Sequence, residues 1–161
     1  LGAALAQAAT RVRIVTPYFL PDQRLQFAIA QARLRGVHID ILIPEWSDYF
    51  FIDWAVRAHL RFFGNANADI HLGPLPFDHS KLMTVDGEWC LVGSSNWDAR
   101  SLRLNFEFDI ECYDSALTAA IDALIDRKIA RARRLSVAML ASAPRWARLR
   151  DAAARLLLPY L

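Results

Sequence analysis

The chain has 161 residues, of which 55% are hydrophobic and 11% aromatic, with 19 Lys and Arg against 17 Asp and Glu. This size and mix exclude a disordered chain and suit one globular domain, and no apolar run is long enough to span a membrane. Cys90 and Cys112 both lie in apolar runs, so we interpret them as small buried hydrophobic residues rather than as a disulfide or metal ligands.

The net charge of +2 hides an uneven distribution along the chain. Residues 1–126 carry ten basic and sixteen acidic side chains, a balance of −6, whereas residues 127–161 carry nine basic side chains and one acidic, a balance of +8. We therefore divide the chain into an acidic body, residues 1–126, and a basic helical extension of the same domain, residues 127–161.

Hydrophobic patterning predicts alternating strands and helices over the first half of the chain, after a short Ala-rich helix. Apolar alternation and β-branched residues indicate strands at residues 11–16, 37–43 and 69–72, and residues 17–21 are expected to form a loop. Since each pair of successive strands is separated by a helix, the strands should pair in parallel.

Capping residues mark the two helices between these strands. Asp22 can cap the first helix, which should end at Gly36, and Ser47 or Asp48 can cap the second. The aromatic residues of the second helix that lie off its main apolar stripe, Phe50 and Phe63, are expected to be exposed.

The second half of the chain predicts antiparallel strands and then helices. The dipeptide Asp86-Gly87 separates two apolar runs and is a strong hairpin signal. Residues 106–113 alternate as a further strand, Asp114 can cap a long helix, and two more helical stretches are split by Pro144. The expected fold is α/β, with a mixed β-sheet sandwiched between helices and a helical C-terminus.

The chemistry is concentrated in residues 79–96. On a strand, His79 and Lys81 would point to the same side, which places an imidazole and a cation on one face, a combination suited to phosphate. The turn Gly93-Ser94-Ser95-Asn96 can add hydrogen-bond donors. Each piece alone is commonplace, because surface histidines, solvated lysines and Gly-Ser-Asn turns are frequent.

The complete spacing, H-x-K-x4-D-x6-G-S-x-N, is that of the phospholipase D superfamily, and every defined position is met. Within it the chain most closely resembles the C-terminal half of bacterial cardiolipin synthases, over about residues 10–161. Four further stretches match this family. They are Thr16-Pro17-Tyr18-Phe19 with Pro21-Asp22, Ser47-Asp48, the segment from Leu91-Val92-Gly93-Ser94 to Arg100-Ser101, and Asn105-Phe106-Glu107.

The resemblance implies a covalent mechanism in which one histidine of a pair attacks the phosphodiester, and the other protonates the leaving alcohol. His79 would be either the nucleophile or the acid, and the reasoning leaves this open. Lys81, Ser94 and Asn96 would bind the substrate phosphate, and Asp86 and Gly93 would be structural. Glu107 would orient the imidazole, although an alternating strand also explains it as part of a solvated polar side. No metal and no cofactor is expected.

Only one such motif is present, whereas the family needs two around one site. His38, His59 and His71 lack the lysine two residues on, so we interpret them as structural. We therefore expect a C-terminal fragment whose site is completed by an N-terminal half carrying the second motif, or by a homodimer partner.

The implied function is phosphatidyl transfer between phospholipids such as phosphatidylglycerol, making cardiolipin. The alternatives are a phospholipase D-type phosphodiesterase or a nuclease acting as a dimer, and a non-catalytic membrane-docking half-domain. The basic extension suits an anionic membrane surface, which predicts a peripheral location at the cytoplasmic face of the cell membrane. Its charges would also suit DNA phosphates, but nucleic acid is the less expected partner.

Overall fold

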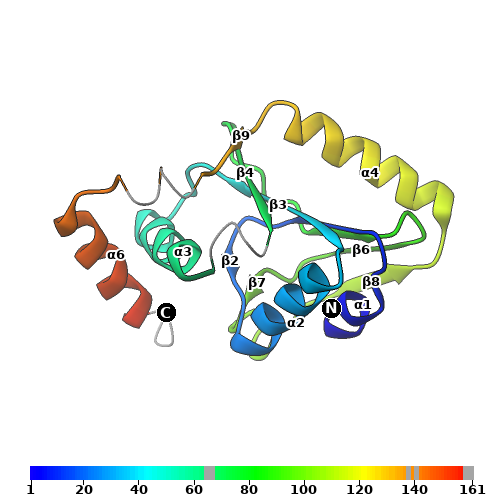
Figure 1. Cartoon of the computed structure of the whole chain (residues 1–161), viewed down its shortest axis with the longest axis horizontal. Coiled ribbons are helices and arrows are strands. Elements are labelled where there is room, and N and C mark those ends of the chain that lie inside the picture. Colours follow the sequence, from blue (N-terminus) through cyan, green and yellow to red (C-terminus); the bar gives the residue numbers. More distant parts are fainter. Residues whose placement is uncertain (64–67, 137–138, 140–141, 158–161) are drawn as a thin grey trace.

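The computed structural model describes residues 1–63, 68–136, 139 and 142–157. Its centre is a seven-stranded mixed sheet with the strand order β8-β6-β5-β1-β3-β4-β9 (Figure 1). The strands are β1 (Arg11–Val15), β3 (His38–Pro44), β4 (Asp69–Gly73), β5 (Leu82–Val85), β6 (Trp89–Gly93), β8 (Asp109–Cys112) and β9 (Arg133–Arg134). The pairs β1–β3 and β3–β4 are parallel and the β5–β6 hairpin is antiparallel, which confirms the predicted mixed sheet.

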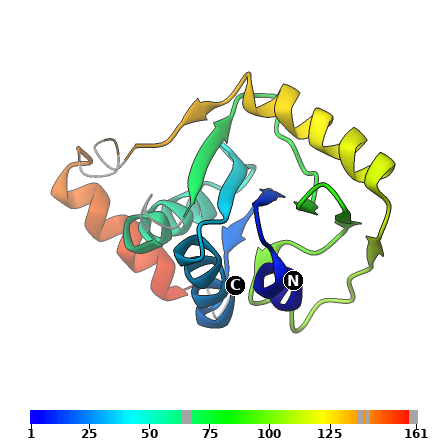
Figure 2. The ribbon, with the colours of Figure 1, turned by 45° about the vertical axis from the view of Figure 1, so that its right-hand side comes forward.

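Helices cover both faces of the sheet (Figures 1 and 2). On one face, α1 (Gly2–Gln7), α2 (Gln23–Leu34) and α3 (Phe50–Phe63) enclose the main hydrophobic core. On the other face, α4 (Ser115–Ile129) packs Ile121 and Ile125 over Val15, Leu42 and Leu82. The helix α6 (Arg145–Leu157) packs on α3, where the Arg150 guanidinium lies 4.2 Å from the Trp54 ring centroid. Among the helices described, none has the length and apolar character needed to cross a bilayer.

The predicted caps are confirmed at two helices. The Asp22 carboxylate accepts a hydrogen bond from the Leu25 amide (3.0 Å), and the Asp114 carboxylate accepts one from the Leu117 amide (2.9 Å). Gly36 has a φ of 92°, a left-handed conformation that ends α2 as expected. These local signals fix where α2 and α4 lie along the chain.

Several expectations need correction where tertiary contacts decide the outcome. Within the expected loop at residues 17–21, the short strand β2 (Phe19–Leu20) pairs in parallel with β7 (Trp97–Asp98). Phe63 is buried rather than exposed because its ring packs edge-on against Phe19, whereas Phe50 is 65% exposed as predicted. The stretch before Pro144 is not all helical, because β9 joins the sheet edge beside β4.

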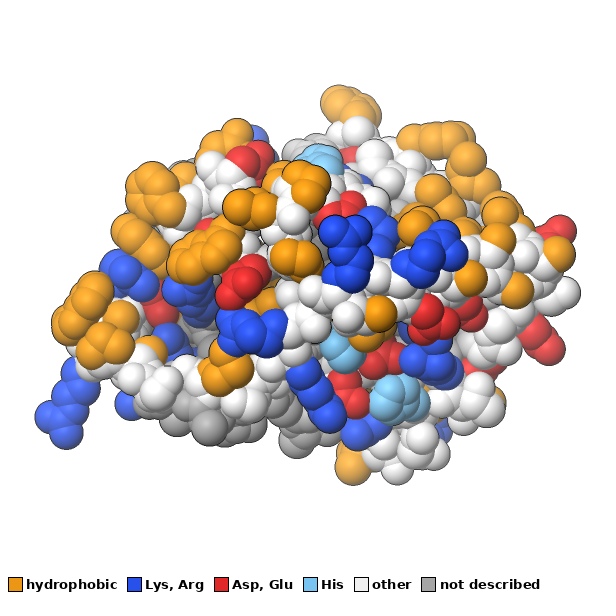
Figure 3. Space-filling model, turned by 90° about the horizontal axis from the view of Figure 1, so that it is seen from above, with side chains coloured by type: hydrophobic (Ala, Val, Ile, Leu, Met, Phe, Trp, Pro, Cys, Tyr) orange, Lys and Arg blue, Asp and Glu red, His pale blue; other side chains and the backbone are white. Residues whose placement is uncertain are grey.

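Much of the basic charge after residue 126 is neutralised within the molecule. Ion pairs join Lys128 to Asp78, Arg133 to Glu45, Arg134 to Asp69 and Arg150 to Asp151. Figure 3 shows one face of the molecule, where basic and acidic side chains are interleaved at the centre and hydrophobic ones lie toward both ends. The basic extension is therefore not one continuous cationic patch.

Candidate functional site

His79 and Lys81 lie together just before the interior strand β5, although not on the strand that was expected to carry them. β5 begins one residue later, at Leu82, and the backbone pairing with β6 extends only to the Lys81 carbonyl, which accepts from the Gly93 amide (3.2 Å). The Lys81 side chain turns back, so that Nζ lies 2.7 Å from His79 Nδ1 and donates to the His79 carbonyl oxygen at 2.9 Å. The lysine is buried and the histidine is exposed.

Two aromatic rings frame the His79 imidazole. The Tyr18 ring lies edge-on to it with a centroid distance of 6.2 Å, and the Phe77 centroid is 5.6 Å away. The Tyr18 hydroxyl donates to Asp48 Oδ1 at 2.5 Å, and burial together with this bond raises the pKa of Tyr18 above its ordinary value. The sequence analysis singled out the stretches containing Tyr18 and Asp48, but it gave neither residue a place beside His79.

Charged neighbours hold Lys81 in place electrostatically. Burial lowers the pKa of the Lys81 ammonium, and the carboxylates of Glu107 and Asp78 oppose that shift. Asp78 is itself fixed, because its carboxylate accepts from the Ser80 amide and hydroxyl and pairs with Lys128. A buried ammonium beside an exposed imidazole is well suited to attract a phosphate oxygen.

The second part of the motif forms a separate hydrogen-bonded group. The Ser94 hydroxyl donates to Glu107 Oε2 at 2.5 Å and accepts from the Phe108 amide at 2.9 Å. Asn96 donates from Nδ2 to the Ser101 hydroxyl (3.2 Å). In the contacts described, Glu107 thus binds Ser94 rather than the His79 imidazole, which it was expected to orient.

Gly93 is required because another strand approaches its backbone. A Cβ at this position would lie 1.8 Å from Oδ1 of Asp109 on β8. That Asp109 oxygen accepts from the Ser95 amide (3.1 Å), and the other accepts from the Ser95 hydroxyl (2.5 Å). Asp109 therefore shapes the turn that presents Ser94 and Asn96. Sequence reasoning missed it, because Asp109 shares the polar side of the expected strand at residues 106–113 with Glu107, and such a side is commonly solvated.

Asp86 lies at the far end of the hairpin from His79. Its φ is 55° and that of Gly87 is 73°, the left-handed pair that a tight hairpin turn requires. The Asp86 carboxylate accepts hydrogen bonds from the backbone amides of Ala9, Thr10 and Arg11, each at 2.8 Å. These bonds tie the β5–β6 hairpin to the start of β1, which gives the motif aspartate a structural position.

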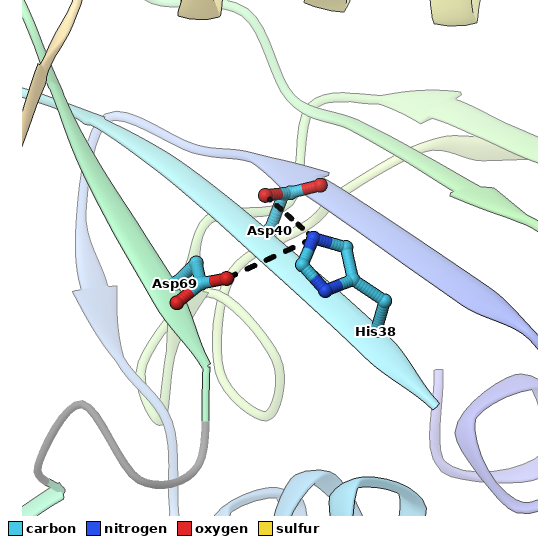
Figure 4. Close-up of side chains that lie close together, drawn as sticks. All are labelled: His38, Asp40 and Asp69. Atoms are coloured by element: carbon cyan, nitrogen blue, oxygen red, sulfur yellow. Dashed lines mark ion pairs between the residues drawn. The ribbon is translucent and has the colours of Figure 1, made fainter. Parts of the chain in front are cut away.

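A cluster of histidine and carboxylate side chains lies at the start of β3 and β4 (Figure 4). The register of β1 with β3 and β5 puts His79 at the opposite end of these strands. His38 Nε2 lies 3.4 Å from Asp40 Oδ1 and 3.7 Å from Asp69 Oδ2, a spacing that a metal ion could bridge. However, Arg11 pairs with Asp40 and Arg134 pairs with Asp69, so the two carboxylate charges are already balanced. This cluster is well explained as an ion-pair network between strands.

Comparisons with known proteins identify the family to which the chain is similar. A family model described as the phospholipase D-like domain of cardiolipin synthase matches residues 1–129. The major cardiolipin synthase ClsA of Bacillus subtilis (strain 168) is 32% identical over 157 residues, which cover 98% of this chain and 33% of that protein. Cardiolipin synthase A of Salmonella arizonae is 36% identical over 138 residues, which cover 86% of this chain and 28% of that protein. The chain thus spans about a third of the length of these curated relatives.

Solved structures share the fold. The phospholipase D family member Nuc from Salmonella typhimurium matches with a TM-score of 0.71 at 20% identity, covering 84% of this chain and 88% of Nuc. Phosphatidylserine synthase from Haemophilus influenzae Rd KW20 matches with a TM-score of 0.76 at 19% identity, and the match covers 97% of this chain and 43% of that protein. At these identities the likeness confirms the α/β fold expected from the sequence.

Proposed function

The chain belongs to the phospholipase D-like domain family of cardiolipin synthase, and on this premise we propose that it is one catalytic half of a phosphatidyltransferase that makes cardiolipin. The observation that carries this proposal is the contact between the His79 imidazole and the buried Lys81 ammonium, 2.7 Å apart. In this proposal residues 1–126 form the catalytic half-domain, and residues 127–161 extend it.

The site residues have complementary roles in the proposed reaction. Lys81, Ser94 and Asn96 bind the oxygens of the substrate phosphate and stabilise the charge that develops on them. One imidazole attacks phosphorus, forming an N–P bond as the bond to the leaving alcohol breaks, and the other imidazole donates a proton to that alcohol. A second alcohol then takes the phosphatidyl group from the histidine. His79 supplies one of these two imidazoles.

The second imidazole comes from a partner half in this proposal, and an exposed apolar strip beside the site suits such a partner. Phe106 and Phe108 flank Glu107 and are 108% and 73% exposed, and Ile110 and Val92 continue the strip onto β8 and β6. Exposed apolar groups gathered on one edge favour a protein interface. Either an N-terminal half with its own motif or a second copy of this chain would cover the strip and complete the site.

A membrane surface is the second partner we propose, through the outward face of α6. Trp146, Leu149 and Leu156 are exposed there beside Arg145 and Arg148. Basic residues near an anionic bilayer contribute about 1 kcal/mol each, and exposed Trp and Leu suit the interface. This face is more limited than the whole basic extension, because Lys128, Arg133, Arg134 and Arg150 of the extension pair with carboxylates.

The test uses the full-length protein and vesicles of phosphatidylglycerol. The proposal predicts cardiolipin and free glycerol as products, measured by mass spectrometry. Phosphatidic acid without cardiolipin would favour a hydrolytic phospholipase D, and cleavage of DNA without lipid turnover would favour a nuclease. Vesicle binding without turnover of either substrate would favour the non-catalytic docking domain.

A further inference from the structure

A cavity of about 580 Å³ adjoins the His79 site, and of its lining residues only Asn96 has a role in the reaction described so far. Its lining includes both aromatic and polar side chains. The principal lining residues are Tyr18, Tyr49, Phe51, Asn96, Arg100 and Asn105. Tyr18 joins the two sites, since its ring lines the cavity and lies edge-on to the His79 imidazole at 6.2 Å. The cavity has the size of a small-molecule site.

Arg100 supplies an unpaired cation at the rim of the cavity. Its side chain is exposed, and within the described part of the chain no carboxylate pairs with its guanidinium. Asp98 also lines the cavity, but its two carboxylate oxygens accept from the amide and the hydroxyl of Ser101. In the same loop, Arg103 is paired with Asp22 at 2.5 Å. A free guanidinium at this rim suits a phosphate.

We propose that this cavity binds the head group of the acceptor phospholipid, an inference that rests on the proposed phosphatidyl transfer. Arg100 pairs with the acceptor's phosphate, and the aromatic residues that line the cavity contact its glycerol carbons. The acceptor oxygen then forms a bond to phosphorus as the bond from phosphorus to the histidine nitrogen breaks. The hydroxyl proton passes to the second imidazole. Filling the cavity with a lipid head group also excludes the water that would otherwise hydrolyse the intermediate.

The experiment compares Arg100→Gln with Arg103→Gln in the full-length protein. Both variants remove one cation from the same loop, but only Arg100 lines the cavity. With phosphatidylglycerol vesicles, we expect Arg100→Gln to lower the ratio of cardiolipin to phosphatidic acid about tenfold. Arg103→Gln should leave this ratio unchanged. Because the exposed Arg100 side chain has no described partner, its replacement should not alter the thermal unfolding midpoint.

A second readout uses an acceptor without a phosphate. Exchange of labelled free glycerol into phosphatidylglycerol uses the same intermediate but offers Arg100 no anion to bind, so Arg100→Gln should exchange at the wild-type rate. Arg100→Lys should restore part of the cardiolipin ratio because it keeps the charge. An unchanged ratio in Arg100→Gln, or an equal loss of exchange and transfer, would overturn the acceptor site. Absence of cardiolipin from the wild-type reaction would instead overturn the proposed function, and the acceptor site with it.

Discussion

The Lys81 ammonium contacts both the side chain and the backbone of His79. Its Nζ lies 2.7 Å from the imidazole Nδ1 and 2.9 Å from the carbonyl oxygen of the same residue. A buried side chain therefore fixes both the backbone and the ring of an exposed one. In the proposed reaction this contact serves two purposes, since it orients the imidazole and places a positive charge where a phosphate oxygen would bind.

Replacing Lys81 with methionine should lower kcat for cardiolipin formation by about 10² to 10³, because a charge that stabilises the transition state is lost. The fold should persist, since methionine fills the same buried space. Lys128→Met is the matched control: it breaks the ion pair with Asp78 but does not remove the cation next to His79. Steady-state kinetics of the full-length variants would measure both. Equal losses of kcat in the two variants would show that Lys81 acts only through the net charge of the region and not through its contact with His79.

Gly93→Ala tests the close approach of Asp109. The new Cβ would lie 1.8 Å from Oδ1 and 2.8 Å from Cα of Asp109, so the strand pair must separate. We expect a loss of about 3 kcal/mol in the free energy of unfolding, together with loss of activity as Ser95 is released. Gly2→Ala, where nothing lies within 4 Å, should be neutral or slightly stabilising. Urea unfolding would measure both, and wild-type stability in Gly93→Ala would contradict the packing.

Asp86→Ala tests the structural role of the motif aspartate. Three backbone amides would lose their acceptor, and alanine would have to adopt a φ of 55°. The expected cost is about 2 to 3 kcal/mol in the free energy of unfolding. Asp86→Asn should lose less, because asparagine tolerates this φ and keeps one acceptor oxygen. If Asp86→Ala unfolds like the wild type but loses turnover, the aspartate has a chemical role instead.

His59 should make the fold sensitive to acid. Burial between Phe19 and Phe63 lowers the pKa of its imidazole from 6.5 to about 4, because the charged form is desolvated. The unfolded chain then binds a proton that the folded chain does not, so stability decreases as the pH falls from about 6.5 toward 4. The full effect, reached once the pH is below both pKa values, is about 3 kcal/mol.

The measurement is urea unfolding of the wild type and His59→Phe between pH 7 and pH 4.5. Phenylalanine fits the aromatic surroundings and cannot be protonated, so His59→Phe should lose less stability over this range. Parallel pH curves for the two proteins would contradict the assignment to His59.

Local signals predicted most of the architecture. The caps at Asp22 and Asp114 and the turn at Asp86-Gly87 depend on side chains within a few residues, and all three are found as predicted. The parallel order of β1, β3 and β4 follows from strand–helix–strand connections, which are restricted for any sequence. Features that depend on residues close together in the sequence could therefore be predicted from the sequence alone.

The missed features depend on segments that meet only in the folded chain. The two-residue strands β2 and β9 have too few residues for a periodic pattern, and each is defined by its partner strand. The contact of Tyr18 with His79 and the close approach of Asp109 to Gly93 likewise join distant parts of the chain. Motif spacing gave the identity of His79 and Lys81 but placed them on a strand that begins only at Leu82.

The central claim is that His79 takes part directly in phosphatidyl transfer. The most direct measurement is the rate of cardiolipin formation from phosphatidylglycerol vesicles by full-length wild-type protein and by His79→Asn. Since His79 is exposed, the variant should fold normally, as the thermal unfolding midpoint would show. The account predicts that the rate falls by about 10³ or more. A folded His79→Asn protein that forms cardiolipin within tenfold of the wild-type rate would contradict it.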